Sequence, residues 1–260
     1  YFILMVMMLG CIGCEWQLRF DESDIVIDRY DRIQSLYLTT SDFSALQQMN
    51  TDYPMQTRTL IEDVLRIGRV NDPEINTKFL HFYQDSTLQE IINEAEQQYA
   101  NMDDLNEDIN SAFRYLKKEI PNFEVPQIYA QIGSLDQSII VGNGMIAICL
   151  DKYLGTEYEL YLKPEFGYTL DQRKMMQRDY IVPDCVGFYL LSLYPMSFDK
   201  PLSQAERDVH IGRIQWVVNK AIGRNMFRSI YVQKIDRFMA KHGNLTIGQL
   251  LDSTQYSDFL

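Results

Sequence analysis

Residues 138–150 read SIIVGNGMIAICL, two apolar runs separated by the turn-forming triplet 142–144. Asn-Gly between two apolar runs is a strong short-range signal for a β-hairpin, because both residues tolerate positive φ angles. The run before the turn is β-branched, and the run after it, Met145–Leu150, is almost wholly apolar. The sequence therefore predicts an antiparallel hairpin near residues 138–150. Looser alternation over Val125–Ile132 predicts a further extended segment.

Helical patterns dominate the rest of the chain. Residues 86–99 and 101–118 repeat apolar side chains every three or four positions, which is typical of the buried face of a helix. Further helices are predicted at about 42–49, 60–68, 170–178, 179–194, 203–222, 229–241 and 246–251. Ile25–Ile27 is a β-branched run that favours a strand. The patterns together predict an α+β fold that is predominantly helical, with a small antiparallel sheet.

The N-terminal residues 2–10, FILMVMMLG, form an uncharged apolar run of the length found in signal peptides. Small residues and Cys14 follow, and polar sequence begins directly after Cys14. We therefore expect residues 1–14 to be a lipoprotein signal peptide with Cys14 lipidated, or alternatively Cys11. Residues 15–24 are expected to form a tether, and residues 25–260 a single globular domain.

The charge balance restricts the classes of partner. The chain has 24 basic and 36 acidic residues, a formal net charge of -12. An acidic protein without a basic stripe is repelled by nucleic acid, so we expect no nucleic-acid partner. The remaining cysteines, Cys149 and Cys185, lie in apolar surroundings and are expected to be buried free thiols; a disulfide between them is the alternative.

The sequence contains none of the short motifs that mark common catalytic sites. Its three histidines are scattered, and none belongs to HExxH. There is no GxSxG elbow and no phosphate-binding loop. We therefore predict no catalytic residue, no metal ligand and no cofactor. Among many carboxylates, Asp151 follows the hairpin and is expected to cap a following helix, and Asp184 after Pro183 suits the first turn of a helix.

Several segments, taken in order, resemble the GldB family of gliding motility-associated lipoproteins of the Bacteroidetes. They are IVIDRYDRI (25–33), FLHFYQD (79–85), AFRYLKKEIPNFEVPQIYAQI (112–132), IAICLDKYLGTEYELY (146–161) and YIVPDC (180–185), with a weaker match at HIGRIQWVVNKAIG (210–223). The motif residues in the fourth and fifth segments, whose role the resemblance does not define, are Asp151, Tyr153, Gly155, Pro183 and Asp184.

The resemblance implies a lipoprotein of the cell envelope, held on the inner or outer membrane and facing the periplasm or the exterior. It implies a non-catalytic assembly component with envelope protein partners, linked to motility or secretion. It also implies a distant relation to zinc metallopeptidases, hence a degenerate zincin-like scaffold without its metal motif. A hydrolase derived from such a peptidase, or a ligand-binding lipoprotein, are the alternative functions.

Overall fold

The computed structural model describes residues 24–196 and 201–260. The predicted signal peptide, with Cys11 and Cys14, and residues 15–23 of the predicted tether lie outside the described residues. The buried apolar side chains form one cluster that extends from Ile25 to Phe259. None of the helices within these described ranges is both long and apolar enough to cross a membrane.

Helices come first along the described chain, then a small sheet, then helices again. The first group is α1 (Tyr30–Thr40), α2 (Phe43–Asp52), α3 (Pro54–Arg58) with a π-helical turn (Thr59–Val64), α4 (Ile75–Tyr83), α5 (Ser86–Gln98) and α6 (Asp103–Glu119). The strands are β1 (Gln127–Gln131), β2 (Ile139–Gly142) and β3 (Met145–Cys149). The last group is α7 (Glu159–Leu162), α8 (Leu170–Met175), α9 (Ile181–Leu193), α10 (Gln204–Ala221), α11 (Ile230–Lys241) and α12 (Ile247–Asp252), with short 3-10 turns between them.

The sheet has the strand order β1-β3-β2. The predicted hairpin is confirmed: β2 and β3 are antiparallel, and the turn residues Asn143 and Gly144 have φ angles of 51° and 72°. β1, however, pairs with β3 in parallel, so the sheet is mixed and the expectation of a purely antiparallel sheet is corrected. β3 lies at the centre of the sheet and all its residues are buried, as its continuous apolar sequence requires, because a central strand is covered on both faces. β2 is partly exposed and lies at an edge. The predominantly helical α+β class is confirmed.

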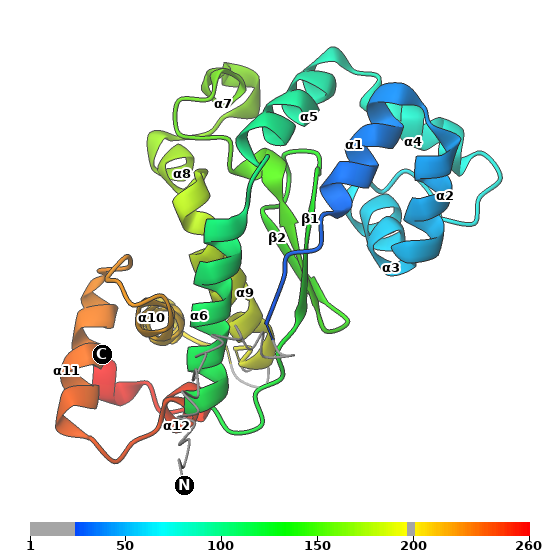
Figure 1. Ribbon diagram of the computed structural model, residues 1–260. Helices are drawn as coiled ribbons and strands as arrows, with labels where there is room; N and C mark the ends of the chain where they lie inside the picture. The colour runs from blue at the N-terminus through cyan, green and yellow to red at the C-terminus, as the bar shows by residue number, and fades with distance from the viewer. Residues whose placement is uncertain (1–23, 197–200) are drawn as a thin grey trace, which may run out of the picture.

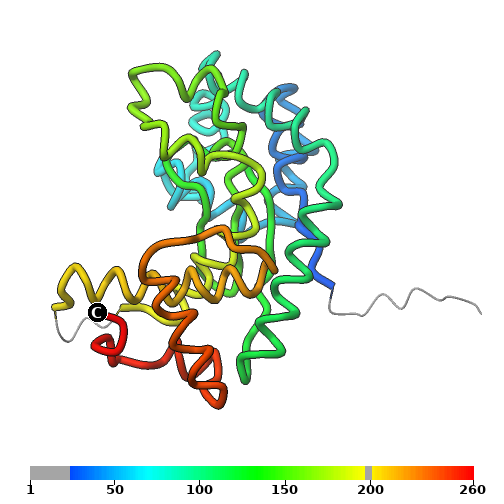
Figure 2. Tube along the Cα trace, turned by 90° about the vertical axis from the view of Figure 1, so that its left-hand side faces the viewer, coloured from blue at the N-terminus to red at the C-terminus, as the bar shows by residue number. Residues whose placement is uncertain are grey.

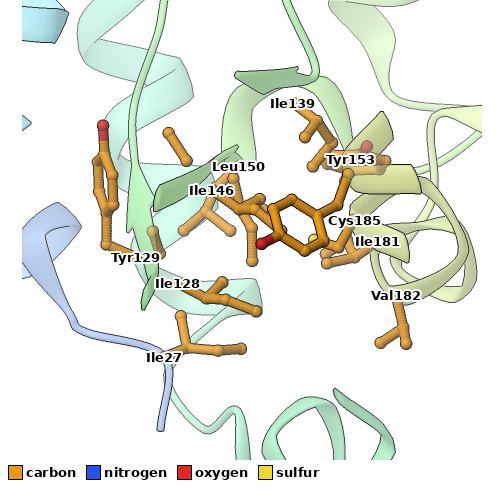
Figure 3. Close-up of a cluster of buried hydrophobic side chains, with 14 of the residues drawn as sticks. Ile27, Ile128, Tyr129, Ile139, Ile146, Leu150, Tyr153, Ile181, Val182 and Cys185 are labelled. Carbon is orange, nitrogen blue, oxygen red and sulfur yellow. The ribbon is translucent and has the colours of Figure 1, made fainter. Parts of the chain in front are cut away.

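Figure 1 shows three groups of helices around this sheet: α6 and α9 at one side, α1–α4 at the other, and α10–α12 at the lower end. Figure 2 shows the same division after a quarter turn, with α1–α4 in the upper half and the C-terminal helices below. Ile128 and Ile146 lie on the sheet face toward Ile181 and Cys185 of α9, whereas Tyr129 points to the opposite face (Figure 3).

The predicted helices with strong N-terminal signals are confirmed. α5 begins after Asp85, whose carboxylate accepts hydrogen bonds from the backbone N–H groups of Thr87 (2.9 Å) and Leu88 (3.3 Å). α10 begins after Ser203 in a capping box with Glu206. α6 carries its acidic residues in the first turn and its lysines in the last, as the helix dipole favours.

The segment Ile25–Ile27 is extended but does not form the strand that its composition predicts. Its backbone N–H groups are taken by the side chains of α6: Ile25 donates to Asn110 Oδ1 (2.6 Å) and Ile27 donates to Asn106 Oδ1 (2.9 Å). Among the described residues, the backbone of this segment pairs with the sheet at one parallel bridge, between Asp28 and Tyr129. The segment therefore lies between α6 and the outer edge of β1.

Candidate functional site

The loop that joins β1 to β2 passes the end of β3, and Asp151 holds it there. Asp151 lies in the 3-10 turn Leu150–Lys152 directly after β3 and is fully buried. Its two carboxylate oxygens accept hydrogen bonds from the backbone N–H groups of Gly133 (2.6 Å) and Leu135 (2.7 Å). The expectation that Asp151 caps a following helix is therefore wrong: its nearest backbone donors belong to the loop arriving from β1. We call residues 132–135 the crossing loop.

The backbone of the crossing loop is shaped to approach this carboxylate. A Cβ atom at Gly133 would lie 3.1 and 3.3 Å from the Asp151 oxygens, so a larger residue would have to displace them. Leu135 has a φ angle of 65°, which is uncommon for a residue with a side chain. Burial raises the pKa of Asp151, and the hydrogen bonds from Gly133 and Leu135 oppose that rise.

Two further buried polar side chains reach the crossing loop from distant helices. Gln34 of α1 donates to the carbonyl of Ile132 (2.7 Å) and accepts from its N–H (2.8 Å). Tyr83, at the end of α4, donates to the carbonyls of Ile132 (2.8 Å) and Gly133 (3.1 Å). Both side chains are fully buried. These two residues were missed in the sequence, although Tyr83 lies within FLHFYQD and Gln34 follows IVIDRYDRI directly.

Lys152 and Tyr168 complete the surroundings of the loop. The Lys152 ammonium group donates to the carbonyl of Leu135 (2.9 Å) and to the Tyr168 hydroxyl (3.0 Å), and the same hydroxyl donates to the Leu135 carbonyl (2.8 Å). Partial burial lowers the pKa of Lys152. Five side chains from four separate parts of the chain therefore stabilise one short loop.

Tyr153 connects this cluster to α9. Its buried hydroxyl donates to Asp184 Oδ2 (2.7 Å), and its carbonyl accepts from the Tyr99 hydroxyl (2.6 Å). Asp184 lies in the first turn of α9, as predicted. Burial raises the pKa of Asp184 to about 6, although the hydrogen bond from Tyr153 acts in the opposite direction. A carboxyl group with a pKa close to neutrality is capable of proton exchange, which makes Asp184 the motif residue best suited to acid–base chemistry.

The two remaining motif residues set backbone geometry. Gly155 has a φ angle of 111°, a conformation that residues with a Cβ rarely adopt, and its N–H donates to the carbonyl of Met176 (2.9 Å). Pro183 is buried in the first turn of α9, where a missing N–H removes no intrahelical hydrogen bond. The structure thus brings Tyr153 to Asp184 at the start of α9, whereas the Asp151 side chain binds the crossing loop instead.

Cys149 and Cys185 are buried free thiols, as expected. Burial raises the pKa of both thiols, which disfavours the reactive thiolate. Cys149 Sγ accepts a hydrogen bond from the side chain of Gln131 (3.3 Å). Both cysteines therefore pack as small apolar residues.

Candidate metal ligands are not grouped in the described ranges 24–196 and 201–260, where no three His, Cys, Asp or Glu side chains could hold an ion together. His81 and His242 are exposed on α4 and after α11. His210 of α10 is buried, and its Nε2 lies 3.0 Å from the carbonyl oxygen of Tyr194. The zincin-like scaffold implied by the resemblance has no support from these observations.

Comparison with known proteins identifies one family. The model of the family described as gliding motility protein GldB matches residues 15–226, which include the crossing loop and all five motif residues. No curated protein and no solved structure matches the chain. The match extends over most of the sequence and includes all the quoted segments. Two of these segments supply Tyr83 and Asp151, which bind the crossing loop. The chain belongs to the GldB family of gliding motility proteins.

Proposed function

We propose that this GldB-family chain is a lipid-anchored protein of the cell envelope, and that its body acts as a non-catalytic assembly component of motility or secretion machinery. The anchor is the diacylglyceryl group on Cys14, and the body faces the periplasm or the exterior from the inner or the outer membrane. Its partners are other envelope proteins and the membrane. The net charge of -12 disfavours nucleic acid as a partner.

The observation that supports the non-catalytic role is that the carboxylate of the motif residue Asp151 binds the backbone of the crossing loop. Both of its oxygens accept backbone N–H groups, and the side chain has no exposed surface. A catalytic carboxylate must reach a substrate, whereas this one fixes the path of the crossing loop. Asp151 and Gly155, two of the residues that the resemblance singles out, therefore support a rigid shape, which is what an assembly component presents to its partners.

Two observations favour an anchor at Cys14. The family match begins at residue 15, one position after this cysteine. The body begins by residue 25, where Ile25 is fixed to Asn110 of α6. The ten residues 15–24 can extend about 35 Å at most, at ~3.3–3.6 Å per residue, which would keep the body close to the membrane surface. Acyl chains on one cysteine add about 0.8 kcal/mol of membrane affinity per buried CH₂ group.

The anchor is tested by replacing Cys14 with serine in the native cell. We expect the Cys14→Ser protein to leave the membrane fraction and to lose the acyl mass from its N-terminal peptide. Cys11→Ser is the matched control and should remain acylated and membrane-bound. A Cys14→Ser protein that stays acylated would refute the assignment to Cys14.

The non-catalytic role is tested with Asp184→Asn in a deletion strain that has a measurable envelope or motility defect. The asparagine keeps an oxygen that accepts the Tyr153 hydroxyl but cannot exchange a proton. We expect full complementation at normal protein level. Loss of a catalytic acid or base typically lowers a rate by ~10²-fold or more, so failure of a normally folded Asp184→Asn protein to complement would contradict the proposal.

A further inference from the structure

A cavity of about 450 Å³ lies where α10 meets α11 and the loop between them. Trp216, Phe227 and Val232 supply its apolar lining, and exposed charged side chains stand among its other lining residues. In Figure 1 this region is at the lower left, where α10 is seen nearly end-on and α11 crosses the view. It is remote in sequence from the crossing loop, and residues 227–237 of its lining lie beyond the part matched by the family.

The walls of this cavity are held in place by buried contacts. The side chain of Asn219 accepts the backbone N–H groups of Met226 (2.9 Å) and Phe227 (3.0 Å) and donates to the Phe227 carbonyl (2.7 Å). One buried amide therefore fixes the loop that carries Phe227. The helices themselves touch at Gly212, where a Cβ atom would lie only 2.8 Å from Tyr231 Cβ. The cavity is thus formed before any ligand arrives, which reduces the entropic cost of binding.

The charges around the cavity are unequal. Lys220, Arg228 and Arg237 contribute three positive charges, and Asp236 contributes one negative charge. Asp236 is already engaged, because its Oδ1 accepts from Trp216 Nε1 (2.8 Å) and from the Lys220 ammonium group (3.0 Å). Two arginines therefore remain as the excess positive charge, in a chain whose overall charge is -12.

The two arginines make few contacts of their own within the described part of the chain. Arg228 Nε donates to the carbonyl of Asn225 (3.0 Å), and Arg237 Nε donates to the carbonyl of Gln233 (3.2 Å). Their terminal guanidinium nitrogens have no hydrogen bond to residues 24–196 or 201–260. The two terminal nitrogens of a guanidinium group can donate parallel hydrogen bonds to two oxygens of one carboxylate, sulfonate or phosphate group.

We propose that this cavity binds a small organic anion with an apolar or aromatic body. The body would pack against Trp216, Phe227 and Val232, and the anionic group would be bound by Arg228 and Arg237. The volume falls within the range of small-molecule sites, which combine an apolar lining with a few polar groups. This binding activity is independent of the assembly role and of the lipid anchor.

The test uses two fluorescent probes that share an aromatic body and differ in charge: anilinonaphthalene sulfonate and phenylnaphthylamine. The full chain carries Trp16→Phe, so that Trp216 is the remaining indole, and is reconstituted in phosphatidylcholine vesicles. We expect the sulfonate to quench Trp216 saturably. The double variant Arg228→Gln/Arg237→Gln should weaken its binding about tenfold, the combined effect of two exposed charge pairs. The neutral probe should not respond to the double substitution.

Arg66→Gln is the matched control, because Arg66 is also exposed and its Nε also donates to a nearby backbone carbonyl, that of Asp63. It should leave the affinity for the sulfonate unchanged. Saturable binding that is equally strong in the double variant would overturn the proposal, as would the absence of saturable quenching at millimolar probe. Circular dichroism of the double variant should match that of the parent, since neither side chain is buried.

Discussion

Removing the Asp151 carboxylate should unfold the protein at a markedly lower urea concentration. In Asp151→Ala the N–H groups of Gly133 and Leu135, bonded at 2.6 and 2.7 Å, lose their acceptors inside the core. A buried backbone donor without a partner costs about 1–3 kcal/mol, so two of them should lower the free energy of unfolding by about 4 kcal/mol. Asp151→Asn retains one acceptor oxygen and should lose about half of that.

The assay is equilibrium urea unfolding of the full chain, followed by circular dichroism. With a slope of ~3 kcal/mol per molar urea, a loss of about 4 kcal/mol moves the midpoint by more than about 1 M. Asp136→Asn is the matched control, since Asp136 lies just beyond the crossing loop and is exposed; it should change stability by less than about 0.5 kcal/mol. If the urea midpoint of Asp151→Ala lies within about 0.3 M of the parent's midpoint, the reasoning is refuted.

Two further substitutions test the start of α9 and the contact between α10 and α11. Asp184 has a pKa raised from 3.8 to about 6, so its contribution to stability is present below pH ~4 and is lost as the pH rises through about 6. Relative to Asp184→Asn, the parent should lose up to about 3 kcal/mol between pH 4 and 8; a difference in unfolding free energy that stays flat would contradict this. Gly212→Ala should lower the melting temperature through a cost of about 1–3 kcal/mol, because the new Cβ meets Tyr231 at 2.8 Å. Gly187→Ala, whose Cβ would meet its nearest neighbour at 3.7 Å, should be neutral or stabilising in the same scan, and equal effects would argue against the packing explanation.

Local features of the fold could be predicted from sequence because their causes are local. The Asn-Gly turn requires positive φ angles that few other residues accept, and Asp85 and Ser203 supply capping oxygens to adjacent N–H groups. The parallel pairing of β1 with β3 could not be predicted, because it depends on packing between two strands that are separated along the chain by β2. The continuous apolar sequence of β3 did indicate that this strand lies at the centre of the sheet.

The helix α1 was missed because its buried face is partly polar. Asp31, Gln34 and Ser35 are buried beside Tyr30 and Tyr37, so the apolar stripe that marks a helix is interrupted. The carboxylate of Asp31 is bound by Arg29 through two hydrogen bonds of 2.9 and 2.7 Å. The sequence alone does not show that the buried charge of Asp31 is paired with Arg29, because this depends on how the two side chains are placed in the structure.

The candidate site was recognised only in part for the same reason. The family resemblance indicated Asp151 and Tyr153 without a role. Gln34 and Tyr83, which bind the same crossing loop as Asp151, lie 98 and 49 residues before Ile132 of that loop. A pattern read along the chain does not reveal which backbone loop a buried amide or hydroxyl will bind. The crossing loop itself, residues 132–135, has an unremarkable sequence, and its conformation depends on side chains from outside it.

The position of residues 24–28 determines how the body would respond to a mechanical load on its N-terminal end. This segment is bonded laterally to Asn106 and Asn110 on one side and, through Asp28, to Ile128 and Ala130 on the other. Traction along the segment would strain these bonds together in shear instead of opening them one after another. Forced unfolding is governed by the rate of crossing the barrier, and simultaneous rupture raises that barrier. A body pulled from the N-terminal side of Asp24 would therefore transmit force into α6 and the sheet before it began to unfold.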